Sequence, residues 1–283
     1  MRARGDQGMR AGCAREGGDC DGRRRAREGR GTTRAFALFV AALVSFVAIA
    51  RGEAPEMVAR DDYERVSGLG YAPNIRNVVP TDGLVARFEG KNAVTGSAWS
   101  SSVGNAKGAV YAGSVSRNSA SGYGAEKQVT YLSGDTNAKM DFGQILPATW
   151  TLCTLARYTG NTRRRIFQAS GNFIHGHWHD RRGVAYYDTW VTPSDPSRGN
   201  KHDWLVMCGT NGAQRVYADG VQIATGSRNG GSGNKKLGIN YGDGSCCNGE
   251  TSDWAVAEIM VWNRALSDDE MLSVTKYLQD DIL

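Results

Sequence analysis

The sequence predicts an all-β fold, a two-sheet antiparallel β-sandwich with one short α-helix at its C-terminal end. About a dozen short apolar or alternating runs follow one another from residue 82, at the spacing of roughly 8–12 residues that is typical of sandwiches. Asp219 and Gly220 lie between two alternating runs, which is typical of a two-residue β-hairpin with a type I′ turn. No pattern with the helical period occurs before residue 266.

Composition divides the chain into a basic leader predicted to be disordered (1–34), an uncharged apolar run (35–50), a polar linker (51–80) and the β-sandwich domain (81–283). The leader holds ten arginines and five acids, which accounts for the whole net charge of +5. The rest of the chain carries 24 basic and 24 acidic side chains and is formally neutral. A neutral domain argues against a basic groove for phosphates, so no nucleic-acid partner is expected.

The apolar run 35–50 predicts entry into the secretory pathway. Its sixteen residues are short for a spanning helix, which needs about 20. Ala48-Ile49-Ala50 fits the small-x-small cleavage site of a signal peptide. The arginine-rich leader would equally hold an uncleaved type II anchor with its N-terminus in the cytosol. We therefore expect a secreted protein, or a single-pass membrane protein with an extracellular domain if the anchor is retained.

The strands of the domain are expected in order along the chain. Leu84, Ala86 and Phe88 alternate with Val85 and Arg87, which predicts the first strand at 82–88. The same reasoning predicts strands at 129–132, 139–142, 150–158, 163–168, 172–179, 183–190, 204–208, 214–218, 221–225, 237–241 and 253–262. The Ser- and Gly-rich stretch 114–124 is interpreted as a loop.

A single helix is predicted after residue 266. Ser267 followed by Glu270 forms the Ser-x-x-Glu capping box that begins many helices. The apolar positions that then share one face at helical spacing are Met271, Val274, Tyr277 and Leu278. We expect this helix to seal one side of the sandwich and to serve packing.

Two stretches resemble the laminin-G-like domains of the concanavalin A-like lectin/glucanase superfamily. One is residues 217–221 (YADGV) after a Trp-led strand, and the other is residues 257–267 (AEIMVWNRALS). The resemblance covers about residue 82 to the C-terminus and implies a jelly-roll sandwich. It also implies that Glu258 is a structural acid of the last strand, and that the strands of Cys153 and Cys208 lie near one another and form a disulfide. Two buried free thiols are the alternative.

A second disulfide is possible between Cys246 and Cys247, which are adjacent in a Gly-rich loop. Adjacent cysteines are closer together than most bridged pairs, so a vicinal bridge would be strained. The same loop, 240–253, offers oxygen donors for calcium at Asp243, Asn248 and Glu250. No cofactor is required by the sequence, and calcium is the one that its loop residues suggest.

Polar and aromatic residues concentrate in 173–190 (FIHGHWHDRRGVAYYDTW). Period-2 alternation predicts one strand face with His175, His177 and His179 exposed to solvent, and the opposite face with Ile174 and Trp178 packed inward. Same-face residues two apart are about 6.7 Å apart along a strand, so the outer histidines would be about 13 Å apart. One zinc ion cannot take all three. A His-x-His pair completed by His202 or Asp180 remains an alternative.

Carbohydrate is the ligand that this region favours. Exposed Tyr and Trp rings offer flat apolar surfaces to the C–H faces of sugars, while Asp, His and Arg satisfy the hydroxyls. The candidate ligand-binding residues are His175, His177, His179, Asp180, Tyr187, Asp188, Trp190 and Arg165. Lectin-like relatives of the resembled family bind glycans with such mixtures. We expect a glycan or another matrix or cell-surface ligand.

Catalysis is not expected. Glucanases of the resembled superfamily carry Glu-x-Asp-x-x-Glu or Glu-x-Asp-x-Glu on one strand, and the chain has neither. A divergent polysaccharide hydrolase that draws its acids from different strands, such as Asp180, Asp188 and Glu126, is one alternative. An adhesion or structural module that binds protein is the other.

Overall fold

The computed structural model describes residues 77–195, 197–213, 215–225, 231–242, 246–247 and 249–283. The described residues belong to one compact unit, Tyr71–Leu283. The predicted leader, the apolar run 35–50 and nearly all of the linker lie outside the described residues, so the predictions for them stay predictions.

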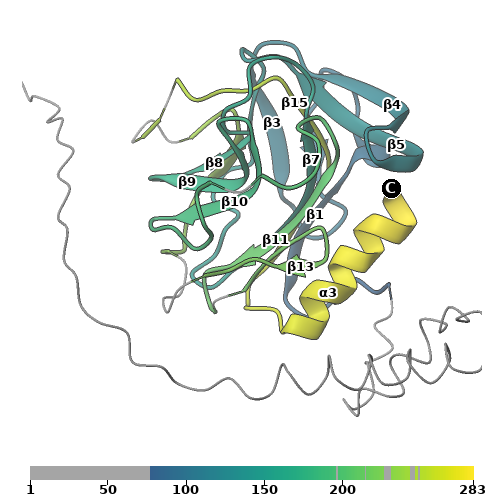
Figure 1. Cartoon of the computed structure of the whole chain (residues 1–283). Coiled ribbons are helices and arrows are strands. Elements are labelled where there is room, and N and C mark those ends of the chain that lie inside the picture. The colour runs from purple at the N-terminus through teal and green to yellow at the C-terminus, as the bar shows by residue number, and fades with distance from the viewer. Residues whose placement is uncertain (1–76, 196, 214, 226–230, 243–245, 248) are drawn as a thin grey trace, which may run out of the picture. The chain divides into compact units, whose positions relative to one another are not determined.

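The described residues form two antiparallel β-sheets that pack face to face, as the sequence predicts (Figure 1). The eight-stranded sheet has the order β13-β12-β11-β7-β15-β5-β4, with β1 also paired to β15. Its strands are β1 (Leu84–Glu89), β4 (Ser116–Gly122), β5 (Ala125–Gly134), β7 (Thr151–Tyr158), β11 (Leu205–Thr210), β12 (Val216–Ala218), β13 (Val221–Gln222) and β15 (Trp254–Trp262).

The seven-stranded sheet has the order β10-β9-β8-β14-β6-β3-β2. Its strands are β2 (Trp99–Ser100), β3 (Lys107–Ala112), β6 (Lys139–Asp141), β8 (Phe167–Ala169), β9 (Phe173–Trp178), β10 (Arg181–Tyr187) and β14 (Leu237–Ile239). A short 3-10 turn, η1 (Gly90–Asn92), follows β1.

Local turn and cysteine predictions hold in the eight-stranded sheet. Asp219 and Gly220 connect β12 to β13 with φ of 50° and 79°, the two positive values that a type I′ turn requires. Cys153 on β7 lies directly opposite Cys208 on β11, and the two form a disulfide. Cys246 and Cys247 are also joined.

Two apolar layers hold the sandwich together. The first lies between the sheets and includes Trp99, Trp150 and Trp254, all without solvent exposure. The second lies on the outer face of the eight-stranded sheet, under the helix α3 (Asp268–Tyr277), which runs along that sheet in Figure 1. Ser267 and Glu270 form the predicted capping box, and the last residues continue as a π-helical turn, η2 (Leu278–Ile282).

Two carboxylates are buried beside the end of α3. Glu89 on β1 lies directly opposite Glu258 on β15. The Arg87 guanidinium lies 3.2 Å from Glu89 Oε1 and 3.7 Å from Glu258 Oε2. The Tyr277 hydroxyl accepts a hydrogen bond from Arg87 at 2.6 Å and donates one to Glu258 Oε1 at 3.2 Å. This cluster joins β1, β15 and α3 beside the outer apolar layer.

Two of the strand predictions are wrong. The stretch 114–124 is not a loop, because it contains β4, which pairs with β5 at the edge of the sheet. An edge strand is held by its backbone hydrogen bonds and carries polar side chains, so its sequence lacks the apolar alternation. The predicted strand 163–168 is replaced by β8 at Phe167–Ala169. The Arg163 carbonyl accepts a hydrogen bond from Asp180 N–H and the Arg164 N–H donates one to the Ser252 hydroxyl, so the backbone here does not join the sheet.

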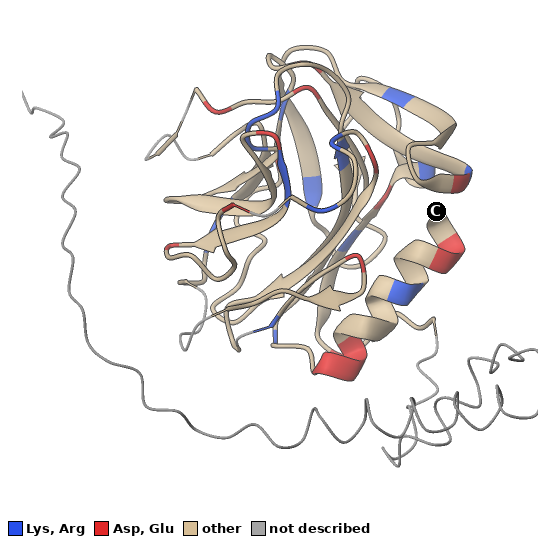
Figure 2. Cartoon of the chain, in the orientation of Figure 1, with Lys and Arg blue, Asp and Glu red and all other residues tan. Residues whose placement is uncertain are grey.

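Charge is mixed over the described part of the domain. Basic and acidic segments are interspersed along the ribbon in Figure 2. Within the described residues, no helix is both long and apolar enough to cross a membrane.

Candidate functional site

The histidines of β9 face the interior, so the predicted exposed histidine face is wrong. His175 and His177 are 0% and 1% exposed. The His175 Nδ1 atom lies 2.8 Å from the hydroxyl of Tyr187, and the His177 ring packs edge-on against Tyr158 at 4.7 Å. Tyr187 is fully buried too, so it cannot meet a ligand as predicted. Alternation placed His175 and His177 on one face as expected, but that face packs against the eight-stranded sheet.

His179 does not belong to that face at all. The strand ends at Trp178, and His179 and Asp180 adopt left-handed φ values of 46° and 68° in the turn to β10. A turn breaks the period of two, so the His179 side chain emerges at the surface. Burial lowers the pKa of His175 to about 3 and lowers that of His177 well below its ordinary value, so both rings are neutral.

The other predicted ligand residues are tied into ion pairs. Arg165 is buried and binds Glu250, Asn172 and the carbonyl of Phe173. Asp180 binds Arg163 at 2.5 Å and Lys201 at 3.3 Å. Arg165 is therefore unavailable to a ligand, whereas 49% of the Asp180 side chain is exposed beside its ion pairs.

Asp188 is likewise held in place. It accepts hydrogen bonds from Ser232 and pairs with Lys235 at 2.9 Å. Burial raises the pKa of Asp188, but Ser232 and Lys235 outweigh burial and lower it. Arg163 lowers the pKa of Asp180 through a side-chain hydrogen bond. Both carboxyls are ionised near neutral pH, so neither holds a proton for general acid catalysis.

The third acid of the hydrolase alternative, Glu126, lies exposed on β5 of the eight-stranded sheet. Asp180 follows β9 and Asp188 follows β10, the two strands at one edge of the seven-stranded sheet. The fold therefore divides the three acids between the two sheets.

The metal predictions fall partly outside the described residues, because Asp243 and Asn248 are not among them. Glu250 is described, and its carboxylate binds the Arg165 guanidinium. The described part of the chain contains no group of three or more His, Cys, Asp or Glu side chains that could hold an ion. His202, the proposed partner for zinc, points its Nδ1 atom toward the Tyr158 carbonyl at 3.4 Å. The calcium site in 240–253 stays a prediction.

The three aromatic residues of 173–190 that are not buried lie together on the outer face of the seven-stranded sheet. Trp178 ends β9, Tyr186 lies on β10, and Trp190 pairs back to Tyr186 through an isolated bridge. The Trp190 ring lies edge-on to Trp178 at 5.4 Å and to Tyr186 at 5.3 Å. We call Trp178, Tyr186 and Trp190 the aromatic platform. The expectation that Trp178 packs inward with Ile174 is wrong, because the outer face of β9 carries it.

Polar groups border the aromatic platform. The Arg181 guanidinium lies 5.2 Å from the Trp178 ring, and Arg181 is opposite Trp178 in the strand pairing. Glu250 accepts a hydrogen bond from Trp178 Nε1 at 3.2 Å and lies 3.4 Å from His179 Nε2. Burial raises the pKa of Glu250, but the charge and hydrogen bond of Arg165 outweigh it and lower the pKa. Glu250 is therefore an ionised acceptor that fixes the Trp178 ring.

The candidate ligand residues predicted from the sequence include His179 and Trp190 of this arrangement but not Trp178, Tyr186 or Arg181, and Glu250 was predicted as a calcium ligand. One signal was available. In the β9–β10 hairpin Trp178 and Arg181 flank the two turn residues, so a hairpin interpretation would have paired them. The contact of Glu250 with Trp178 links positions far apart in the sequence and had no sequence signal.

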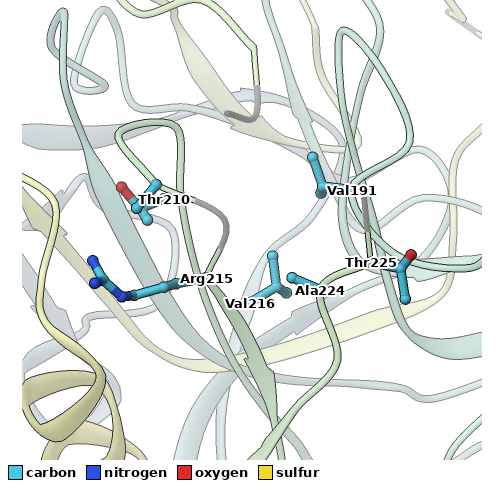
Figure 3. A pocket seen from close by; sticks show the side chains of 7 residues that line it. Val191, Thr210, Arg215, Val216, Ala224 and Thr225 are labelled. Carbon is cyan, nitrogen blue, oxygen red and sulfur yellow. The ribbon is translucent and has the colours of Figure 1, made fainter. Parts of the chain in front are cut away.

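A pocket lies elsewhere, among Val191, Thr210, Ala213, Arg215, Val216, Ala224 and Thr225 (Figure 3). The room inside it for a water-sized molecule is about 10 Å³, far below the roughly 300–1,000 Å³ of ordinary ligand sites. Arg215, on its wall, pairs with Asp268 at 3.0 Å. The pocket is a packing gap beside β12, and the aromatic platform is the better candidate for binding.

Fold and site together define a β-sandwich with an exposed aromatic surface on one sheet. The sequence matches no protein-family model and no curated protein sequence. Among solved structures, a Trypanosoma rangeli sialidase in complex with 2,3-difluorosialic acid is similar with a TM-score of 0.48 and 17% identity over 72% of this chain. This chain spans 34% of that sialidase chain.

Two further structures are similar. Domain 4 of AbnA, an extracellular GH43 arabinanase from Geobacillus stearothermophilus in complex with arabinotriose, has a TM-score of 0.48 and 13% identity over 68% of this chain and 98% of its own. The binding domain of botulinum neurotoxin DC in complex with SialylT has a TM-score of 0.46 and 13% identity over 70% of this chain and 52% of its own. At these TM-scores and identities the three structures carry no argument about the ligand of this chain, and the resemblance to laminin-G-like domains stays a prediction.

Proposed function

We propose that this protein is a non-catalytic carbohydrate-binding protein that holds sugar rings on the aromatic platform. One observation carries the proposal. The chain has seven tryptophans, and the only two that are not buried, Trp178 and Trp190, lie side by side on the outer face of one sheet. Each of these partly exposed rings is a flat apolar surface that the C–H face of a sugar can contact, and the two rings are inclined at 61° to each other.

The border of the platform supplies what sugar hydroxyls need. Arg181 donates hydrogen bonds, the Glu250 carboxylate accepts them, and the exposed His179 ring can do either. Sites of this kind combine an apolar surface with a few placed polar groups. The ion pair between Arg165 and Glu250 holds the border in position and limits the entropy lost when a ligand binds.

Two features support a non-catalytic protein that acts outside the cytosol. Asp180 and Asp188, the acids nearest the platform in sequence, are both ionised and paired. The disulfide between Cys153 and Cys208 suits an oxidising compartment, as does the apolar run 35–50 that would direct the chain there.

The test compares the wild-type protein with Trp190→Ala on a glycan array and by calorimetry on the glycans that bind. Removing the Trp190 ring should weaken binding by about tenfold or more, which corresponds to ~1.4 kcal/mol. Tyr123→Ala is the matched control, because Tyr123 is 50% exposed but lies on the hairpin between β4 and β5 of the other sheet. It should bind as the wild type does.

The proposal fails if no glycan binds the oxidised wild-type protein, or if Trp190→Ala binds unchanged. Capture of a matrix protein that Trp190→Ala abolishes, with no glycan bound, would assign the platform to protein adhesion. Release of reducing sugar from a bound polysaccharide would make the protein a hydrolase.

A further inference from the structure

The acids beside the aromatic platform are neutralised by cations of the same domain. Asp180, in the turn between β9 and β10, pairs with both Arg163 and Lys201. Glu250, which holds the platform from its border, pairs with the buried guanidinium of Arg165. Two acids are therefore matched by three cations. Because their charges are compensated within these pairs, the two carboxylates exert little repulsion on an anionic ligand.

Arg181 adds a further positive charge at the edge of the platform. Its guanidinium lies 5.2 Å from the centroid of the Trp178 ring. Among the described residues its one acidic partner is Asp195, at 3.8 Å, which is too far for a hydrogen bond. The Asp195 side chain is 91% exposed, so water and salt screen this pair. The pair is weak, and Arg181 can exchange it for an acceptor on a ligand.

Trp178 connects Arg181 to the more exposed ring of the platform, Trp190. The distances of 5.2 Å from the guanidinium to the Trp178 centroid and 5.4 Å from there to the Trp190 centroid set an upper limit of 10.6 Å between Arg181 and Trp190. A sugar that contacts Trp190 can therefore present a substituent, or the next sugar unit, to Arg181. The contact with Trp178 also restricts the guanidinium before a ligand arrives, which lowers the entropy cost of binding.

We propose that the ligand is an acidic glycan whose sugar units carry a carboxylate, and that Arg181 binds this carboxylate while Trp190 contacts a sugar ring. The inference rests on the proposed function of the platform. A guanidinium presents paired N–H donors in one plane, and they match the two oxygens of a carboxylate. Charge-assisted hydrogen bonds of this kind are roughly twice as strong as neutral ones. A neutral sugar offers Arg181 only hydroxyl oxygens and binds more weakly.

The charge of the domain favours a carboxylate over a densely sulfated chain. Residues 35–283 hold 24 basic and 24 acidic side chains, and in the described part of the domain they are interspersed (Figure 2). A densely sulfated polymer is attracted by a continuous basic surface, which this distribution does not provide. The platform offers Arg181 beyond the cations that its ion pairs use, and this single charge suits one carboxylate.

The experiment measures binding of the full chain to trisaccharides of galacturonic, glucuronic and mannuronic acid by calorimetry, each as the free acid and as the methyl ester. Methyl esterification removes the charge and keeps the sugar rings and the chain length. For the series that binds, the wild type should bind the acid at least tenfold more tightly than the ester. Raising the salt from about 0.05 M to about 0.5 M should weaken binding of the acid and not that of the ester.

Two variants assign the preference to Arg181. Arg181→Gln should reduce the ratio between acid and ester affinity to less than twofold. Arg117→Gln is the matched control, because it removes the same charge from an exposed arginine on β4 of the other sheet. It should keep the tenfold preference. Urea unfolding of both variants checks that neither loss of charge has disturbed the fold.

The outcomes separate this inference from the proposed function. If acid and ester bind alike and Trp190→Ala abolishes the binding of both, the acidic ligand is refuted and the platform stands. A preference for the acid that persists in Arg181→Gln would overturn the role of Arg181. If neither form of any series binds and the array shows neutral glycans alone, the inference again fails while the proposed function holds. An empty array refutes both.

Discussion

Replacing Glu258 with glutamine should make the domain more stable at pH 8 and leave its stability at pH 4.5 unchanged. Glu258 is buried between Arg87, Glu89 and Tyr277, with 4% of its side chain exposed. Burial raises its pKa, Arg87 opposes that effect, and the Glu89 carboxylate adds to it, so the pKa rises from 4.5 to about 7. A glutamine side chain at this position would be neutral at every pH and nearly the same shape.

The sign follows from proton linkage. Between pH 4.5 and about 7 the folded chain binds a proton at Glu258 that the unfolded chain has lost. The free energy of unfolding therefore falls as pH rises through this window, and the contribution of the proton is fully present only below pH 4.5. Each pH unit is worth about 1.4 kcal/mol, which gives a total of about 3 kcal/mol. The Glu258→Gln variant lacks this loss.

The assay is urea unfolding of both proteins from about pH 4.5 to about pH 8, with tryptophan fluorescence as the probe. The difference between the two unfolding free energies cancels the other titrating groups. It should grow from near zero at about pH 4.5 to about 3 kcal/mol above about pH 7 in favour of Glu258→Gln. A flat difference, or greater stability of the wild type at the alkaline end, would refute the reasoning.

Glu89→Gln is the matched comparison, because Glu89 lies directly opposite Glu258. Burial raises the pKa of Glu89, but hydrogen bonds from Lys91 and Ser102 and the charge of Arg87 outweigh it and lower the pKa. The ionised Glu89 stabilises the fold above its unfolded pKa, and this contribution is lost as pH falls. Glu89→Gln should thus be less stable than the wild type at neutral pH, the opposite sign to Glu258→Gln.

Two further predictions concern the Cys153–Cys208 disulfide and the ion pair between Arg165 and Glu250. Replacing both Cys153 and Cys208 with alanine opens a loop of 55 residues. The free energy of unfolding, measured with urea, should fall by about 4 kcal/mol. Alkylation of both cysteines in the denatured, unreduced protein would contradict the disulfide. Glu250→Gln leaves the buried Arg165 without its counter-charge and should cost about 2 kcal/mol at neutral pH, less than a fully buried pair because Glu250 is partly exposed. That cost should shrink as pH falls and the wild-type carboxyl is protonated, and a constant cost from acid to neutral pH would show that its charge is not involved.

The features that the sequence predicted correctly depend on residues close together in the chain. Asp219 and Gly220 specify their turn because two positive φ values suit few residue types. Ser267 and Glu270 specify the start of α3 because each side chain satisfies the other's backbone N–H. The pairing of Cys153 with Cys208 needed more than local chemistry, and it followed only from the resemblance to a known family.

The features that it did not predict depend on which face of a strand is covered. Period-2 alternation divides β9 into two faces but does not say which one meets the other sheet. Histidine and tryptophan occur both in cores and on surfaces, so His175 and Trp178 did not indicate the buried face by themselves. The contacts of Glu250 with Trp178, and of Glu258 with Glu89, join residues far apart in the chain and have no local signal.

The covering of one sheet explains why the other carries the exposed rings. Helix α3 lies over the outer face of the eight-stranded sheet, so Trp262 is fully buried there and Met271 packs in the same layer. No such helix covers the outer face of the seven-stranded sheet among the described residues. A tryptophan placed there stays in contact with water and forgoes about 25 cal/mol of folding free energy for each Å² of apolar surface left exposed. Trp178 and Trp190 on that face therefore contribute less to folding than fully buried rings would, and a ligand that covers them would gain that free energy.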